Sequence, residues 1–270
     1  MDVSRSLNWS ARGGYAARGV VYLVVGTMAV LAAIGSGAAE DTQGALREIL
    51  NQPLGGVLLG IVALGLVFFA IWRLIQAFGD PDGLGTGGKG LVIRAGMLGS
   101  AIIHLALAVF AASLIFSVSI GGGSGGGGGD PTAGWLSWLF GRDWGRWVAL
   151  GIALVPVGIG IAHIVKGWKA SYERYMMADA ETLRRIRPVC AFGLIARGVT
   201  FIVIGILAFY GGGIYDANDA PGLDEALQWI QDLPFGWLLL LMVALGLIAF
   251  AAYAFVEAWY RRIGVERAGV

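Results

Sequence analysis

The twelve residues YAARGVVYLVVG (Tyr15 to Gly26) return 179 residues later as LIARGVTFIVIG (Leu194 to Gly205). Six of the twelve positions are identical: Ala, Arg, Gly, Val, Val and Gly. A second correspondence follows each phrase, at an offset of 181, because Pro-x-Gly and ALGL of residues 53–66 return in residues 234–247. A phrase written twice at a nearly constant offset indicates an internal repeat, and the repeat decides the fold.

A diverged third copy lies between these two. In it Gly96 aligns with Gly14, and Lys166 aligns with Gln76. The sequence therefore predicts three repeats, at residues 11–80, 92–170 and 190–262, within a single membrane domain that covers residues 1–270.

The composition is typical of a membrane protein. The chain has 270 residues, of which 57% are hydrophobic and 14% charged, whereas about 25% charge is usual in soluble domains. Six segments without Asp, Glu, Lys or Arg approach or exceed the length of roughly 17–25 residues that a spanning helix needs. They are Gly19 to Ala39, Pro53 to Trp72, Ala95 to Ser119, Trp147 to Val165, Gly198 to Tyr215 and Leu233 to Val256. Their apolar character is continuous and does not alternate, so helices are predicted and strands are disfavoured.

These features predict an all-α integral membrane fold with six transmembrane helices. Each repeat holds two spans, so all three helical hairpins enter the membrane in the same direction and are parallel repeats. Three copies suggest a pseudo-threefold bundle about an axis along the membrane normal. The outer segments GALREILNQP, GWLSWLF and GLDEALQWIQDLP are each expected to form a short amphipathic helix in the outer interface; ordinary loops are the alternative.

The charge distribution predicts the orientation. If both termini are cytoplasmic, sixteen Lys and Arg residues fall inside and three outside, namely Arg47, Arg142 and Arg146. The positive-inside rule favours this orientation. The basic face is then expected to meet the lipid bilayer through anionic lipid, and no loop is long enough to make a basic soluble face for nucleic acid.

Small residues recur along each outer copy of the repeated phrase. Gly19 and Gly26 are seven residues apart, as are Gly198 and Gly205, which places each pair on one helix face. Small residues allow close helix packing in lipid. We therefore expect Gly26→Leu and Gly205→Leu to be disruptive, and Gly125→Leu, in the glycine-rich segment 121–130, to be silent.

The phrases AARGVVYLVVG, QPLGG, ALGL and the terminal FVEAWYRRIGV resemble the bacterial membrane family catalogued as domain of unknown function 1206. The resemblance covers nearly the whole chain and implies three tandem two-span repeats in a bacterial inner (plasma) membrane. The middle repeat departs from the pattern, because Ser100 and Ala101 replace the Arg-Gly pair. The resemblance implies no activity.

Polar residues gather near the predicted cytoplasmic ends of the spans. Arg18 and Arg197 lie at the mouth of the small-residue stripe, where snorkelling to the headgroups is one interpretation. The second helices carry equivalent polar positions at their inner ends: Arg73, Gln76, His163, Lys166 and Glu257. We expect these residues to form a polar ring or cavity about the axis, with Arg197 or Arg261 within reach of Glu257; interfacial anchoring is the alternative.

The two histidines, His104 and His163, both lie in the middle repeat. Ionisable residues inside a membrane are candidates for function. One hypothesis is that both line a single polar cavity that faces the cytoplasm, and the alternative is two separate hydrogen-bonded residues. A metal site needs three or four ligands, so none is predicted.

The sequence does not indicate catalysis. No charged residue falls near the centre of a span, and no catalytic or cofactor-binding motif is present. GLGTGGKG (Gly83 to Gly90) resembles a phosphate loop, but it lacks the final Ser or Thr and a preceding strand. The chain is therefore expected to be a structural or partner-binding envelope protein without enzymatic activity or cofactor, with an unidentified protein partner. The alternative is a channel or transporter for a small or neutral solute along the pseudo-threefold axis.

Overall fold

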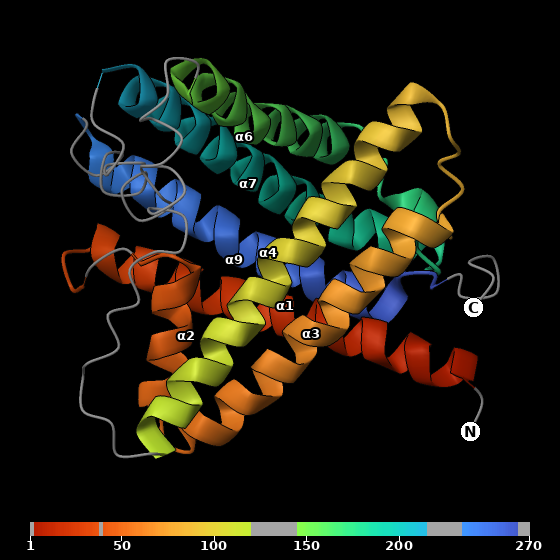
Figure 1. Cartoon of the computed structure of the whole chain (residues 1–270), viewed down its shortest axis with the longest axis horizontal. Helices are drawn as coiled ribbons and strands as arrows, with labels where there is room; N and C mark the ends of the chain where they lie inside the picture. Colours follow the sequence, from red (N-terminus) through yellow and green to blue (C-terminus); the bar gives the residue numbers. More distant parts are fainter. Residues whose placement is uncertain (1–2, 38–39, 120–144, 215–233, 264–270) are drawn as a thin grey trace.

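The computed structural model describes residues 3–37, 40–119, 145–214 and 234–263, and the described chain is helical (Figure 1). Its only strand-like feature among these residues is an isolated bridge between Met176 and Arg261. The helices are α1 (Val3–Ala33), α2 (Thr42–Asn51), α3 (Gly55–Gly79), α4 (Gly88–Ser119), α6 (Gly145–Trp168), α7 (Ala180–Ile214) and α9 (Gly236–Tyr260), with a 3₁₀ turn at Glu173–Tyr175.

Five of these helices are long and apolar enough to cross a membrane. The qualifying stretches are Ser6–Ala33, Gly55–Gly79, Gly88–Phe116, Ala180–Ile206 and Gly236–Tyr260. The sixth predicted span corresponds to α6, whose shorter apolar part within the described side chains is Ala153–Trp168. The all-helical prediction is therefore confirmed.

The first helix of each repeat is longer than its predicted span. Helix α7 begins at Ala180 rather than at Gly198, and α1 begins at Val3 rather than at Gly19. Charged residues end an apolar run, but they do not end a helix, because Arg and Glu are good helix formers. The start of α7 is capped by Asp179, whose carboxylate accepts the N–H of Thr182 at 2.9 Å.

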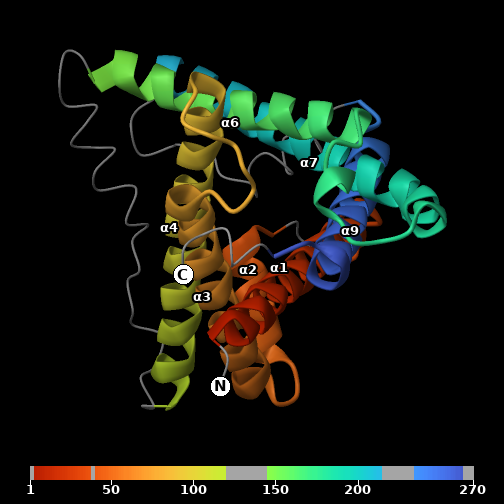
Figure 2. The same ribbon diagram turned by 90° about the vertical axis from the view of Figure 1, so that its right-hand side faces the viewer.

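The helices associate in three close pairs: α1 with α9, α3 with α4, and α6 with α7. Each pair joins the first helix of one repeat to the second helix of a different repeat. Figure 2 shows that these pairs cross one another instead of running parallel, with the α3–α4 pair standing steeply and the α6–α7 pair passing over its end. The repeats therefore interlock, and no hairpin is an independent unit.

The hairpins of the first and third repeats pack through matching residues. A Cβ placed at Gly14 would lie 2.6 Å from the backbone nitrogen of Phe69. One placed at Gly193, the equivalent position in α7, would overlap the backbone nitrogen of Phe250. The middle hairpin differs. Its helices α4 and α6 do not pack along their lengths over the described residues, and a Cβ at Gly96, the third equivalent position, would meet nothing within 4 Å.

Of the three predicted outer helices, α2 alone falls within the described part of the chain. Its N-cap Asp41 accepts the N–H of Gly44 at 2.8 Å, and Leu46 and Ile49 are buried as the amphipathic pattern predicts. The apolar face of α2 packs on α1, α3 and α4. Helix α2 therefore buries this face against other helices of the protein, whereas the sequence predicted a helix that lies in the outer interface. The segments GWLSWLF and GLDEALQWIQDLP, and also Gly125, lie outside the described residues.

The second helices of the first and third repeats begin with the same turn. Leu54 and Phe235, each following a proline, adopt left-handed conformations with φ of 61°. A Cβ at the next residue, Gly55, would overlap the carbonyl oxygen of Leu50. The repeated Pro-x-Gly is therefore a steric requirement of a sharp entry into the helix.

Candidate functional site

Glu257, near the end of α9, is the centre of a buried ion-pair network. Its Oε2 accepts a hydrogen bond from Nη2 of Arg18 at 2.7 Å, and its Oε1 accepts one from Nη1 of Arg261 at 2.6 Å. The three side chains are only 2–7% exposed. Each carboxylate oxygen thus has its own arginine, which is the arrangement that makes a buried carboxylate tolerable.

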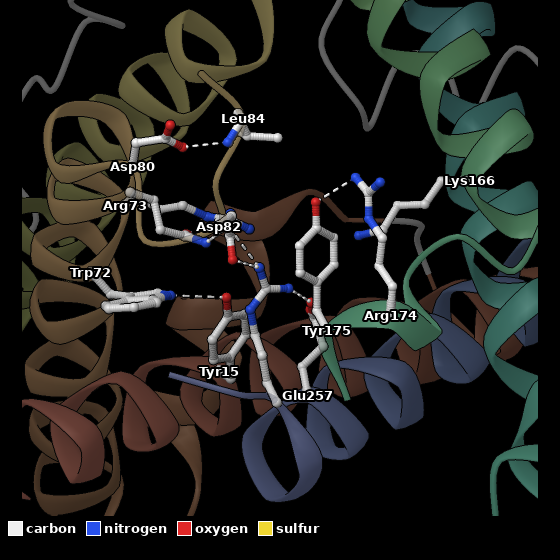
Figure 3. Close-up of polar contacts among 12 residues, drawn as sticks. Tyr15, Trp72, Arg73, Asp80, Asp82, Leu84, Lys166, Arg174, Tyr175 and Glu257 are labelled. Carbon is white, nitrogen blue, oxygen red and sulfur yellow. Dashed lines mark hydrogen bonds and ion pairs between the residues drawn. The ribbon is translucent and has the colours of Figure 1, made fainter. Parts of the chain in front are cut away.

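The network continues toward α3, beside which Arg73 and Asp82 lie close together (Figure 3). Nη2 of Arg261 lies 3.1 Å from Oδ2 of Asp82, and that oxygen also accepts a hydrogen bond from the Gln76 amide at 2.6 Å. Arg73 then donates to Oε1 of Gln76 at 2.9 Å. One chain of contacts therefore links α1, α9, the segment after α9, the α3–α4 connection and α3.

Two phenylalanines each support two arginines. The guanidinium carbons of Arg18 and Arg73 lie 4.9 and 4.8 Å from the ring centre of Phe69. Those of Arg18 and Arg197 lie 5.1 and 4.4 Å from the ring centre of Phe250. Phe69 and Phe250 occupy the same position in the first and third repeats, so the repeat builds this series of cation–π contacts twice.

Arg197 differs from Arg18 in its surroundings. It lies over the rings of Tyr22 and Phe201, at 4.2 and 4.9 Å, in addition to Phe250. No ion pair to Arg197 is present among the residues that the structure describes. The expectation that either Arg197 or Arg261 reaches Glu257 is therefore met by Arg261, and the other partner is Arg18. Because Arg18 is buried and paired, it does not snorkel toward headgroups.

Lys166 joins the cluster from α6. Its Nζ donates to the hydroxyl of Tyr253 at 2.8 Å. The residues described so far are called the polar cluster below: Arg18, Arg73, Gln76, Asp82, Lys166, Arg197, Glu257 and Arg261. The structure brings together all the candidate ring residues except His163, which contacts the aromatic residues beside the cluster.

Each of the two histidines forms a hydrogen bond with a backbone carbonyl group of its own helix. Nδ1 of His104 is 2.7 Å from the carbonyl oxygen of Ser100, and Nδ1 of His163 is 2.9 Å from that of Ile159. In the neutral ring this places the proton on Nδ1. The His104 ring lies 4.5 Å from Phe69, and the His163 ring lies 5.7 Å from Phe201. No contact joins the two histidines in the described structure, and a shared cavity stays a prediction. Within the same residues no group of three or more His, Cys, Asp or Glu is placed to hold a metal ion.

Hydrogen bonds to backbone groups tie α1 to α9, α4 to α3, and the α6–α7 connection to the segment after α9, near the polar cluster. Arg12 on α1 donates to the carbonyl oxygen of Ala258 at 2.7 Å, and its counterpart Arg94 on α4 donates to that of Ala77 at 2.7 Å. The α6–α7 connection and the segment after α9 exchange N–H···O bonds, from Met177 to Tyr260 and from Arg262 to Tyr175. The polar cluster thus lies where four segments of chain converge.

The α3–α4 connection is shaped by Asp80. Its carboxylate accepts the N–H groups of Leu84 and Gly85, both at 2.7 Å. These bonds, that of Leu84 foremost, hold the pKa of Asp80 below its ordinary range. The folded loop places Oδ2 of Asp82 at 3.1 Å from Nη2 of Arg261.

Sequence reasoning missed Asp82 and Tyr253. Asp82 follows the second predicted span by ten residues and belongs to no repeated phrase, so only its place in a short connection at the basic end marks it. Tyr253 lies inside an apolar span, where a hydroxyl needs a partner. A tyrosine in an apolar span could therefore have been recognised from the sequence as a residue with a hydrogen-bond partner, and in the structure this partner is Lys166.

The four stripe glycines lie at helix crossings. A Cβ at Gly26 would lie 2.7 Å from Cγ1 of Ile248, and one at Gly205 would lie 2.5 Å from Cγ2 of Val157. Gly19 similarly faces the Phe255 ring, and Gly198 faces the backbone of Gly160. Gly19 and Gly26 thus meet α9, and Gly198 and Gly205 meet α6.

Comparison with known proteins places the chain in a family. A profile described as Domain of Unknown Function (DUF1206) matches three segments, residues 13–80, 95–170 and 192–261. The Uncharacterized protein YxxB of Bacillus subtilis (strain 168) is 28% identical over 263 residues, which are 95% of this chain and 92% of that protein. No solved structure matches the chain. Since the three matched segments cover most of the sequence and coincide with its tandem repeats, the chain belongs to the DUF1206 family.

Proposed function

We propose that this protein is a non-enzymatic structural or partner-binding component of a bacterial plasma membrane. It spans the membrane six times, as three parallel hairpins about a pseudo-threefold axis. The matching contacts of Gly26 with Ile248 and of Gly205 with Val157 support this arrangement. Both termini are cytoplasmic, and the basic end meets anionic lipid and a protein partner but not nucleic acid.

The proposal rests on the ion pairs within the polar cluster. Glu257 and Asp82 both have arginine partners, and these pairs connect segments that are distant in sequence. A carboxylate held by two arginines is poorly suited to move a proton, because its charged form is strongly stabilised. These acids therefore fix the shape of one end of the bundle, and that shape presents the exposed basic residues of the α6–α7 region.

The orientation is tested by a topology reporter. A reporter that is active only outside the cytoplasm, fused after Val270, should stay silent in the native membrane. The same reporter fused to a chain truncated after Gly37, beyond the first span, should be active. The opposite pattern would contradict the cytoplasmic placement of the cluster.

The role is tested by crosslinking and by flux. A photoreactive residue at Arg184 or Arg185, both exposed at the basic end of α7, should yield a discrete protein adduct in native membranes. The same residue at Ile102, which is 62% exposed on the apolar face of α4, should yield none. Liposomes that contain the purified protein should be no more permeable to glycerol or urea than empty liposomes.

A conduit for a small solute is the second candidate, favoured by the open middle hairpin. Helices α4 and α6 leave the ring of packed helices unclosed over the described residues, and neither Gly96 nor Gly99 has a neighbour that would meet a Cβ. Solute flux well above that of empty liposomes, without an adduct at the basic end, would favour the conduit over the structural role.

A further inference from the structure

The α6–α7 interface repeats the α1–α9 interface, residue for residue. Gly26 of α1 faces Ile248 and Ala244 of α9, and Gly205 of α7 faces Val157 and Ala153 of α6. The offsets are 179 for the first helices and 91 for the second helices in both contacts. A residue on one interface therefore has a definite counterpart on the other.

The charges at the equivalent ends of these interfaces differ. Arg18 pairs with Glu257 across α1 and α9 at 2.7 Å. Their counterparts are Arg197 on α7 and Lys166 on α6. Where the first interface places a carboxylate between helices, the second places another cation.

The polar cluster as a whole has more positive than negative charge. It contains five cationic side chains, Arg18, Arg73, Lys166, Arg197 and Arg261, and two carboxylates, those of Asp82 and Glu257. The carboxylates form their ion pairs with Arg18 and Arg261. Over the described ranges, no carboxylate lies within ion-pair distance of Arg73, Lys166 or Arg197. Uncompensated positive charge in a site of low polarity favours an anion from outside.

The cations without a carboxylate are less deeply buried than the paired ones. Arg18, Glu257 and Arg261 are buried, whereas Lys166 and Arg197 are half-buried. Nε is shielded from solvent and without a hydrogen-bond partner among the described atoms in four arginines of the cluster, Arg18, Arg73, Arg197 and Arg261. Arg18 and Arg261 have carboxylate partners on their other nitrogens, whereas Arg197 has none in the described structure, so its guanidinium is available to an anion.

We infer that Arg197 and Lys166 bind an anion of the phosphate type, which takes the place that the Glu257 carboxylate holds at the equivalent α1–α9 interface. The guanidinium of Arg197 supplies paired N–H donors, and the ammonium of Lys166 supplies a point charge. The rings of Tyr22, Phe201 and Phe250 hold the guanidinium in position. The phosphate belongs to an anionic lipid headgroup or to a soluble phosphate. The site does not depend on which side of the membrane this end faces.

The test uses the full-length protein and two probes. Thermal unfolding is measured in neutral detergent with and without inorganic phosphate, and in phosphatidylcholine nanodiscs with and without phosphatidylglycerol. At least one probe should raise the Tm of the wild-type protein. Arg197→Gln and Lys166→Gln should each weaken the response to that probe by about tenfold or more in anion concentration. Arg47→Gln, which removes an exposed arginine from α2, should respond like the wild type.

Lys166→Glu separates loss of binding from loss of folding. This variant places a carboxylate at the position of α6 that is equivalent to Glu257 of α9. A Lys166→Glu protein that keeps the helical circular dichroism of the wild type should no longer respond to either probe.

The outcomes are decisive in each arm. A response to phosphate in detergent identifies a soluble anion, and a response only to phosphatidylglycerol identifies a lipid headgroup. The inference is overturned if the wild type responds to neither probe, if the Arg197→Gln and Lys166→Gln variants respond like the wild type, or if Arg47→Gln loses the response equally. It is also overturned if the folded Lys166→Glu protein still responds. None of these results depends on the reporter and flux results that test the proposed function.

Discussion

Glu257→Gln is expected to lower the free energy of unfolding by about 3–5 kcal/mol, the usual cost of removing one partner from a buried ion pair. The substitution leaves two arginines, each 6–7% exposed, without the carboxylate that they share. Arg261 keeps Asp82 as a partner, so Arg18 bears most of the loss. Equilibrium unfolding in detergent, followed by circular dichroism, measures the change.

The matched control is Glu181→Gln. Glu181 also pairs with an arginine, Arg185, but their side chains are 60% and 75% exposed. Exposed pairs contribute little because water and salt screen them, so this variant should unfold like the wild type. The losses of unfolding free energy measured separately for Arg18→Gln and Glu257→Gln should sum to clearly more than the loss measured for the double variant. Strict additivity would show that the pair does not couple α1 to α9.

Gly205→Leu is expected to destabilise the α6–α7 interface by about 1–3 kcal/mol or more, the usual cost of overpacking a close contact. A Cβ at this position would lie 2.5 Å from Cγ2 of Val157 and 2.9 Å from the carbonyl oxygen of Ala153. The first atom can rotate away, but the second belongs to a helix backbone and cannot. Gly26→Leu should behave alike, because Ala244 places the equivalent oxygen 3.1 Å away.

The control for both glycines is Gly99→Leu. Gly99 lies within helix α4, and a Cβ there would meet no atom within 4 Å. Leucine is a better helix former than glycine, so this variant should be as stable as the wild type or slightly more stable. Equal thermal stability of all three variants would show that the glycine stripes do not lie at the helix crossings.

The helical class and the family were predictable because both depend on local pattern. In lipid, the backbone polar groups of an uninterrupted apolar run can be hydrogen-bonded within the run only if it is helical. The repeats were found by comparing parts of the sequence with each other, which requires no structure. The helix ends were less predictable. The helix of the third copy begins eighteen residues before the apolar run that marks it, at Ala180, because charge limits the span and not the helix.

The partners within the polar cluster were the least predictable feature. The repeat predicts which residues are equivalent, but it does not predict which helices become neighbours. Glu257 was expected to meet Arg197 or Arg261, and Arg261 is indeed one helical turn away on the same chain segment. The contact with Arg18 arises because α9 packs against the first helix of the chain. Asp82 enters through the folding of a loop, which no periodicity encodes.

The pairing of the first helix with the last has a consequence for biogenesis. Arg18 and Glu257 are 239 residues apart, so the ribosome completes nearly the whole chain before Arg18 acquires its counter-ion. At about 5–20 residues per second this takes roughly 10–50 s. During that time an unneutralised guanidinium in the nascent first helix disfavours release from the insertion machinery into lipid. The contact between α1 and α9 can therefore form only after translation of α9, which makes assembly of this protein a late and concerted event.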